Sequence, residues 1–142
     1  MPSRLSQAIC IMGVGITLLA AHSASADTPK HTKDSLDKVR KALKEKKALL
    51  VDVREKKEWD AGHLEVAKLV PLSDLSANAD DDEYAKKLAK KLPRKKILYL
   101  HCRSGGRVLR ATPILKKFGY DVRPLKPGYE SLLKAGFKKA KK

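Results

Sequence analysis

A cysteine followed by a short, polar, glycine-rich stretch is the feature of this sequence best suited to chemistry. Cys102 follows an apolar run, Gly105 and Gly106 come next, and Arg107 opens a segment with helical periodicity. Glycines allow successive backbone N–H groups to turn toward one point, and a helix N-terminus adds about half a positive charge there. Together with the charges of Arg103 and Arg107, this arrangement favours the thiolate of Cys102 over the thiol. Such a thiolate is suited to attack the outer sulfur of a dianion such as thiosulfate and to hold the resulting persulfide.

The alternative interpretation of Cys102 is a buried, inert cysteine at a strand end, because cysteine is among the most frequently buried residue types. An inert thiol needs neither the two arginines nor the two glycines that follow Cys102 within five residues. The sequence therefore predicts a nucleophilic Cys102. The residues predicted to bind the anionic donor and the departing group are Arg103, Ser104, Gly105, Gly106 and Arg107.

The first 26 residues differ from the rest of the chain. Arg4 is their only charge, residues 8–21 are almost wholly apolar, and Ala24-Ser25-Ala26 is a small-x-small sequence. A charged n-region, an apolar h-region and a cleavage site in this order are typical of a secretory signal peptide; the alternative is an uncleaved anchor. We expect cleavage after Ala26 and export to the periplasm. The exported chain then contains one cysteine, Cys102, and a lone thiol in an oxidising compartment indicates a chemical role.

The elements that must position Cys102 alternate between helix and strand. Apolar periodicity predicts helices over 34–47 and 107–118, and another that carries Tyr84, Leu88 and Leu92. Short helices are expected over 56–61, ended by Gly62, and over 129–135. Pro113 is expected to kink or shorten its helix. Short apolar runs predict strands over 48–53, 68–70, 96–101 and 121–125, and residues 73–79 are expected to form a loop. This alternation predicts a single α/β domain with an open, mostly parallel sheet, at whose carboxyl edge Cys102 would lie.

The sequence resembles the rhodanese-like domain family over nearly the whole exported chain. Four motifs follow the family's order and spacing: Leu49-Leu50-Val51-Asp52-Val53-Arg54, Glu58-Trp59-Asp60-Ala61-Gly62-His63-Leu64, Val70-Pro71-Leu72 and Cys102-Arg103-Ser104-Gly105-Gly106-Arg107. The resemblance implies a five-stranded parallel sheet flanked by helices and ping-pong sulfur transfer through a cysteine persulfide. The expected organisation is a signal peptide over 1–26, a linker over 27–33, a rhodanese-like domain over 34–137 and a basic tail over 138–142.

The loop from Cys102 to Arg107 counts six residues, which matches the sulfurtransferases of this wider family. The related dual-specificity phosphatases have a loop one residue longer, so a phosphatase is disfavoured. By the same resemblance, structural support of the site falls to Asp52, Arg54, Glu58 and His63. Asp52 and Arg54 should each be paired because an unpaired buried charge is costly, and Arg54 and Glu58, four residues apart, are candidates for pairing with each other. His63 is interpreted as a turn residue that hydrogen-bonds the backbone.

The expected activity is transfer of a sulfane sulfur from a small anionic donor to a thiol or to cyanide. No cofactor is expected. No metal is expected either, because the histidines and Cys102 lack metal-ligand spacing. A non-catalytic sulfur carrier or polysulfide-binding protein is the first alternative. The formal net charge of +16 leaves a second alternative open, which is a module that binds polyanions or an anionic membrane surface. Export and an aromatic content of only 5% argue against nucleic acid. The sequence does not define the oligomeric state.

Overall fold

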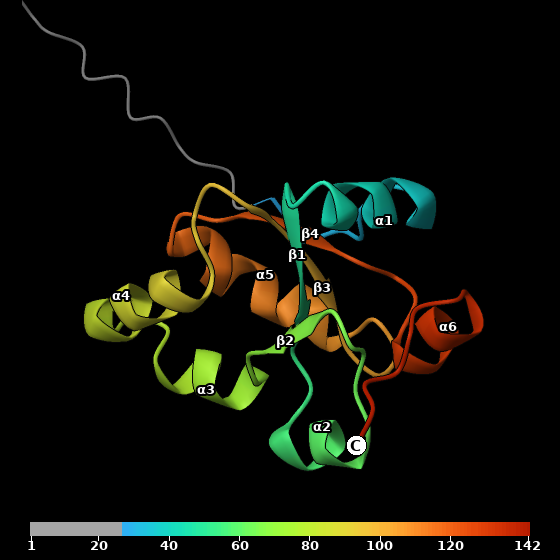
Figure 1. The fold of residues 1–142 in the computed structure, drawn as a ribbon. Helices are drawn as coiled ribbons and strands as arrows, with labels where there is room; N and C mark the ends of the chain where they lie inside the picture. The colour runs from blue at the N-terminus through green and yellow to red at the C-terminus, as the bar shows by residue number, and fades with distance from the viewer. Residues whose placement is uncertain (1–26) are drawn as a thin grey trace, which may run out of the picture.

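The computed structural model describes residues 27–142, so the predicted signal peptide lies outside the described residues and stays a prediction. Helices and strands alternate along the chain, as the periodicity predicts (Figure 1). Their bounds are α1 Leu36–Lys44, β1 Ala48–Asp52, α2 Lys56–Ala61, β2 Ala67–Leu69, α3 Leu72–Ala77, α4 Asp82–Lys91, β3 Ile97–His101, α5 Arg107–Lys117, β4 Asp121–Pro124 and α6 Tyr129–Lys134.

The strands form one parallel sheet in the order β2-β1-β3-β4. Alternate side chains point to opposite faces of a strand, and each face of this sheet is covered by helices (Figure 1). Val51 and Leu100 pack on one face with residues of α3, α4 and α5. Leu50 and Tyr99 pack on the other face with residues of α1 and α6. The α/β class and the parallel sheet predicted from the sequence are therefore confirmed.

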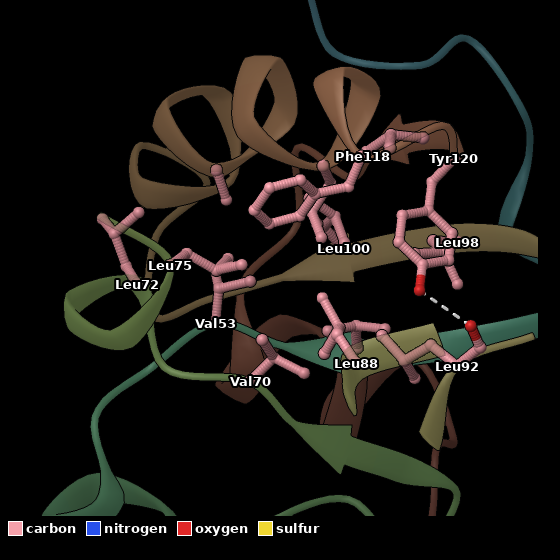
Figure 2. Close-up of a cluster of buried hydrophobic side chains, with 14 of the residues drawn as sticks. Val53, Val70, Leu72, Leu75, Leu88, Leu92, Leu98, Leu100, Phe118 and Tyr120 are labelled. Atoms are coloured by element: carbon pink, nitrogen blue, oxygen red, sulfur yellow. Dashed lines mark hydrogen bonds between the residues drawn. The ribbon is translucent and has the colours of Figure 1, made fainter. Parts of the chain in front are cut away.

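The larger of the two clusters attaches α4 to the sheet and to α5 (Figure 2). Leu88 and Leu92 at the C-terminal end of α4 pack with Leu98, Phe118 and Tyr120. The hydroxyl of Tyr120 is buried and donates to the carbonyl of Leu92 at 2.8 Å, so the polar end of this ring is satisfied within an apolar layer.

The expected fifth strand is absent from residues 27–142, whose sheet has four strands. The position beside β4 is taken by the segment before α1, which makes one backbone hydrogen bond to that strand, from Thr32 N to Pro124 O at 2.7 Å. Proline has no N–H and cannot return a ladder bond. The segment is therefore extended beside the sheet without joining it as a strand.

One local prediction is wrong. Residues 73–79 were expected to form a loop, but residues Leu72–Ala77 form α3, which buries Leu72 and Leu75. Tertiary packing of these two leucines outweighs the loop-forming composition around them. Pro113 was expected to kink or shorten its helix, and it does not shorten it, because α5 runs through Pro113 to Lys117. No helix within residues 27–142 has the length and apolar character that crossing a membrane requires.

The register of β1 and β3 brings Arg54 and Cys102 to the same edge of the sheet. Asp52 at the end of β1 pairs in register with His101 at the end of β3, so the residues that follow both strands emerge side by side. These are Val53 and Arg54 on one strand and Cys102 on the other. Ligands of open parallel sheets bind at this carboxyl edge.

At this edge the backbone at Gly128 lies close to the backbone at Arg103, and this contact predicts how a substitution would change stability. A Cβ added to Gly128 would lie 1.8 Å from the carbonyl oxygen of Arg103, whereas one added to Gly106 would meet nothing within 4 Å. We expect Gly128→Ala to lower the free energy of unfolding by about 3 kcal/mol, because backbone must move to relieve the clash. Gly106→Ala, the matched control, should change it by less than about 1 kcal/mol. Urea titration measures both values, and equal effects would contradict the prediction.

Candidate active site

Cys102 lies directly after β3 and is 1% exposed. Its Sγ accepts a hydrogen bond from the backbone N–H of Gly105 at 3.1 Å, and its carbonyl accepts one from the N–H of Tyr129 at 2.9 Å. Residues 102–107, hereafter the Cys102 loop, therefore turn back on the sulfur, while α6 fixes the main chain at the start of the loop. A backbone donor on the sulfur stabilises a thiolate more than a thiol.

Gly105 is required by its conformation and by its surroundings. Its φ is +85°, a left-handed value that disfavours residues with a Cβ. An added Cβ would also lie 2.4 Å from the carbonyl oxygen of Lys126 and 3.3 Å from Nε2 of His31. The glycine predicted from the sequence thus serves to bring its N–H onto Sγ in a crowded position.

The other amides of the Cys102 loop supply the remaining donors. The N–H groups of Ser104, Gly106 and Arg107 have no acceptor within residues 27–142. Arg107 begins α5, so the free amides at the start of this helix carry its partial positive charge. Backbone donors without an acceptor in a loop that begins with a cysteine are available to bind a small anion or a persulfide.

Arg107 makes a bidentate ion pair with Glu58. Its Nη1 and Nη2 donate to the two carboxylate oxygens at 2.6 and 2.8 Å. This contact lowers the pKa of Glu58 to about 2 and raises the pKa of Arg107. Glu58 also accepts from the N–H of Glu55 at 3.0 Å, which closes a capping box at the start of α2. The carboxylate therefore ties the end of the Cys102 loop to α2.

The predicted pairing of Arg54 with Glu58 is wrong, because Arg54 pairs with Asp52. Nε and Nη2 of Arg54 reach the buried Asp52 carboxylate at 2.8–3.0 Å, and Nη2 also donates to the carbonyl of Gly62 at 2.8 Å. Arg54 precedes α2, so the i, i+4 geometry of a helix does not apply to it. Its guanidinium lies 4.1 Å from the centre of the Tyr129 ring, the residue whose N–H holds Cys102.

Two histidines lie in this region: His101 at the end of β3, with Nε2 3.7 Å from Asp52 Oδ2, and His63 directly after Gly62. His101 is fully buried, and within residues 27–142 neither ring nitrogen has a hydrogen-bond partner. Burial lowers the pKa of His101, opposed by Asp52 and reinforced by Arg54, which favours the neutral ring. His63 stacks on Trp59 with ring centroids 3.7 Å apart, and its Nδ1 lies 3.1 Å from the Trp59 carbonyl. No group of His, Cys, Asp and Glu within residues 27–142 has an arrangement that could hold a metal ion.

Arg103 is exposed and opens onto a cleft of about 480 Å³ beside the Cys102 loop. The cleft also receives Lys139, since the C-terminal segment pairs with the turn after α2 through an antiparallel bridge between Leu64 and Lys139. The residues that line it are Arg54, Glu58, Ala61, Gly62, Arg103, Tyr129, Glu130, Leu133 and Lys139. Among the described residues, Arg107 forms an ion pair with a carboxylate and Arg103 forms none.

One residue at the loop was missed by sequence reasoning. Nε2 of His31 lies 2.7 Å from the carbonyl oxygen of Gly105, across 74 positions of sequence. His31 belongs to the segment predicted as a polar linker, and no periodicity or motif there signals such a contact.

Comparison with known proteins agrees with this geometry. The family model for the rhodanese-like domain matches residues 35–135. The probable adenylyltransferase/sulfurtransferase MoeZ of Mycobacterium tuberculosis is 34% identical over 101 residues, which are 71% of this chain and 22% of that protein. The uncharacterized protein YqhL of Bacillus subtilis is 35% identical over 86 residues, 60% of each chain. The structure of the human single-domain sulfurtransferase TSTD1 covers 71% of this chain and 94% of its own, with 27% identity and a TM-score of 0.59.

The Arg107–Glu58 pair predicts a pH-dependent loss of stability in Glu58→Gln. The pKa of Glu58 is about 2 against an ordinary value of 4.5, so ionised Glu58 contributes fully above about pH 4.5 and progressively less toward pH 2. Both side chains are about one quarter to one third exposed, and screening limits the expected loss at pH 7 to about 1 kcal/mol.

The control is Asp60→Asn, which removes an exposed pair with Lys56 from the same helix and should change stability by less than about 0.5 kcal/mol. Unfolding free energies at pH 7 and pH 3 measure the difference between each variant and the natural chain. A Glu58→Gln effect that is the same at both pH values would contradict the assignment.

Proposed function

The chain belongs to the rhodanese-like domain family, and from that premise we propose that it is a sulfurtransferase that carries sulfane sulfur as a persulfide on Cys102. The donor is thiosulfate or a similar anion, and the acceptor is a thiol or cyanide. The observation that carries the proposal is the Gly105 N–H donating to Cys102 Sγ, in a loop where the N–H groups of Ser104, Gly106 and Arg107 have no acceptor within residues 27–142. The names of MoeZ and TSTD1 as sulfurtransferases support it, although the chain spans only 22% of the length of MoeZ.

The proposed reaction has two displacement steps. The Cys102 thiolate attacks the outer sulfur of thiosulfate, a sulfur–sulfur bond forms on Cys102, and the bond inside thiosulfate breaks with its electron pair leaving on sulfite. The acceptor thiolate or cyanide then attacks the outer sulfur of the persulfide, and Cys102 leaves as a thiolate. Each step exchanges one bond to sulfur for another, so no oxidant, reductant or cofactor enters.

The residues of the Cys102 loop divide these tasks. The free N–H groups of Ser104, Gly106 and Arg107 are suited to hold the departing sulfite and the persulfide. Arg103, which forms no ion pair within residues 27–142, supplies a positive charge beside them. Arg107 already shares both terminal nitrogens with Glu58, so we expect it to act mainly by fixing the loop.

A sulfur carrier is the second candidate function, and the 1% exposure of Cys102 favours it over an enzyme that accepts large acceptors. A carrier loads one sulfur per chain and releases it slowly to small acceptors. Multiple turnovers of thiosulfate with cyanide would exclude a carrier.

Cys102→Ser tests the nucleophile. Serine keeps the size of the side chain but is hardly ionised at neutral pH, so we expect thiosulfate:cyanide sulfur transfer to be abolished while the circular dichroism spectrum and the unfolding free energy stay close to those of the natural chain. After thiosulfate treatment, mass spectrometry should detect one added sulfur atom on the natural chain and none on the variant. A folded variant that keeps most of the activity would refute the proposal.

The same mass measurement on protein isolated from its host bears on export, which we also propose. A chain that starts at Asp27 supports removal of residues 1–26, and a soluble chain that retains them contradicts it. Within residues 27–142 Cys102 is the only cysteine, so an internal disulfide cannot protect it in an oxidising compartment.

Arg103→Ala and Arg107→Ala should separate charge from loop structure. Loss of a charge-assisted contact to a dianion costs about 2 kcal/mol in transition-state binding, so we expect Arg103→Ala to lower kcat/KM for thiosulfate about 30-fold with little change in stability. Arg107→Ala should lower both kcat/KM and the free energy of unfolding, because Glu58 loses its partner. Unchanged kinetics in Arg103→Ala would exclude its role in donor binding.

A further inference from the structure

We infer that His31 is a positioning residue of the active site, which holds the Gly105 carbonyl and thereby the N–H group that contacts Cys102 Sγ. The inference rests on the proposed function for its kinetic consequence, but the contact itself is structural. His31 precedes residues 35–135, the part of the chain that matches the family model. The support is therefore supplied by this chain from outside its family domain.

The segment that carries His31 is fixed to the sheet at two points. Thr32 N donates to the carbonyl of Pro124 at 2.7 Å. The Asp34 carboxylate accepts from the Tyr99 hydroxyl at 2.8 Å and from Arg123 Nη1 at 2.9 Å. A hydrogen bond from Lys38, followed by those from Tyr99 and Arg123, holds the pKa of Asp34 well below its ordinary value. Since Asp34 is anchored to both β3 and β4, the ring of His31 is presented to the loop from a rigid base.

The direction of the hydrogen bond follows from its partner. A backbone carbonyl only accepts, so the His31 ring must carry a proton on Nε2, which lies 2.7 Å from Gly105 O. In a trans peptide, the C=O of Gly105 and the N–H of Gly106 point in opposite directions. Holding the carbonyl on the His31 side therefore directs the Gly106 N–H away from His31, and it has no acceptor within residues 27–142.

Gly105 is thus held from three directions. Its N–H reaches Cys102 Sγ at 3.1 Å, its carbonyl reaches His31, and the carbonyl of Lys126 is so close that an added Cβ would lie 2.4 Å from it. A left-handed glycine is free to leave this conformation when one contact is removed. Removing the His31 ring should therefore loosen the only donor within residues 27–142 that contacts the sulfur.

The tautomer of His31 tests the contact without reference to any activity. Long-range ¹H–¹⁵N NMR spectra of the natural chain at pH 8 should show the neutral His31 ring protonated on Nε2. A ring protonated on Nδ1, with Nε2 bare, would overturn the inference. Because no sulfur donor is present, this result stands whether or not the protein transfers sulfur.

Kinetics test the consequence with a matched set of variants. His31→Ala removes the donor, His31→Gln restores an N–H at a similar reach, and Lys33→Ala alters an exposed neighbour. With thiosulfate, we expect His31→Ala to lower the single-turnover rate of persulfide formation about fivefold, the size of one net hydrogen bond, while the half-saturating concentration changes by less than about twofold. His31→Gln should recover most of the rate, and Lys33→Ala should match the natural chain.

A purely structural role would change stability but would not be rescued in rate by glutamine. A rate in His31→Ala equal to that of Lys33→Ala, or a His31→Gln rate no better than that of His31→Ala, would overturn the inference. If the natural chain forms no persulfide at all, the proposed function fails while the NMR result still decides the His31 contact. If His31→Ala does not fold, the tautomer and the glutamine variant remain decisive.

Discussion

A buried carboxylate at the end of the central strand constrains this structure more than any other group. Asp52 is fully buried, and an unpaired charge there would be prohibitively costly. Arg54 meets the requirement by folding back onto Asp52, and in doing so it also binds the carbonyl of Gly62 after α2 and lies over the ring of Tyr129 in α6. The N–H of Tyr129 then holds the carbonyl of Cys102. One ion pair therefore connects β1, the turn after α2, α6 and Cys102.

The Cys102 loop is ordered by its neighbours as much as by its own residues. Two glycines give it the freedom to turn its amides inward, but the same freedom would allow other conformations. Glu58 fixes the far end through Arg107, whereas Lys126 and His31 confine the middle at Gly105. Each of these contacts comes from a different part of the chain. Together they hold the loop in one geometry, although its two glycines would allow others. Preorganised donors of this kind need no rearrangement when negative charge arrives.

Much of this arrangement was predictable because it depends on local pattern. Helix α2 has the bounds expected from the sequence, with Gly62 directly after its end, and the transition from β3 through the loop into α5 follows from an apolar run, two glycines and a helical repeat. The partners were not predictable, because pairing depends on directions that the tertiary fold sets. Arg54 and Glu58 have helical spacing, but Arg54 lies before the helix. His31 lies 74 positions from its partner in a segment without periodicity. The fifth strand does not form because Pro124 of β4 has no N–H to donate. The sequence alone does not show that this N–H is needed, because the need arises only when another segment lies beside β4.

The burial of Cys102 and the basic charge of the chain act on different stages of the proposed reaction. A net charge of +16 raises the local concentration of any small anion and is screened by salt, but it does not distinguish one anion from another. Discrimination must then come from the loop, where a sulfur that is 1% exposed admits only a donor whose reactive atom projects from a small body. The acceptor meets the same restriction unless the loop moves, since the persulfide sulfur lies only one bond farther out. The adjoining cleft, with Arg103 and Lys139 on its walls, is the part of the described surface where an acceptor larger than cyanide would find both space and charge.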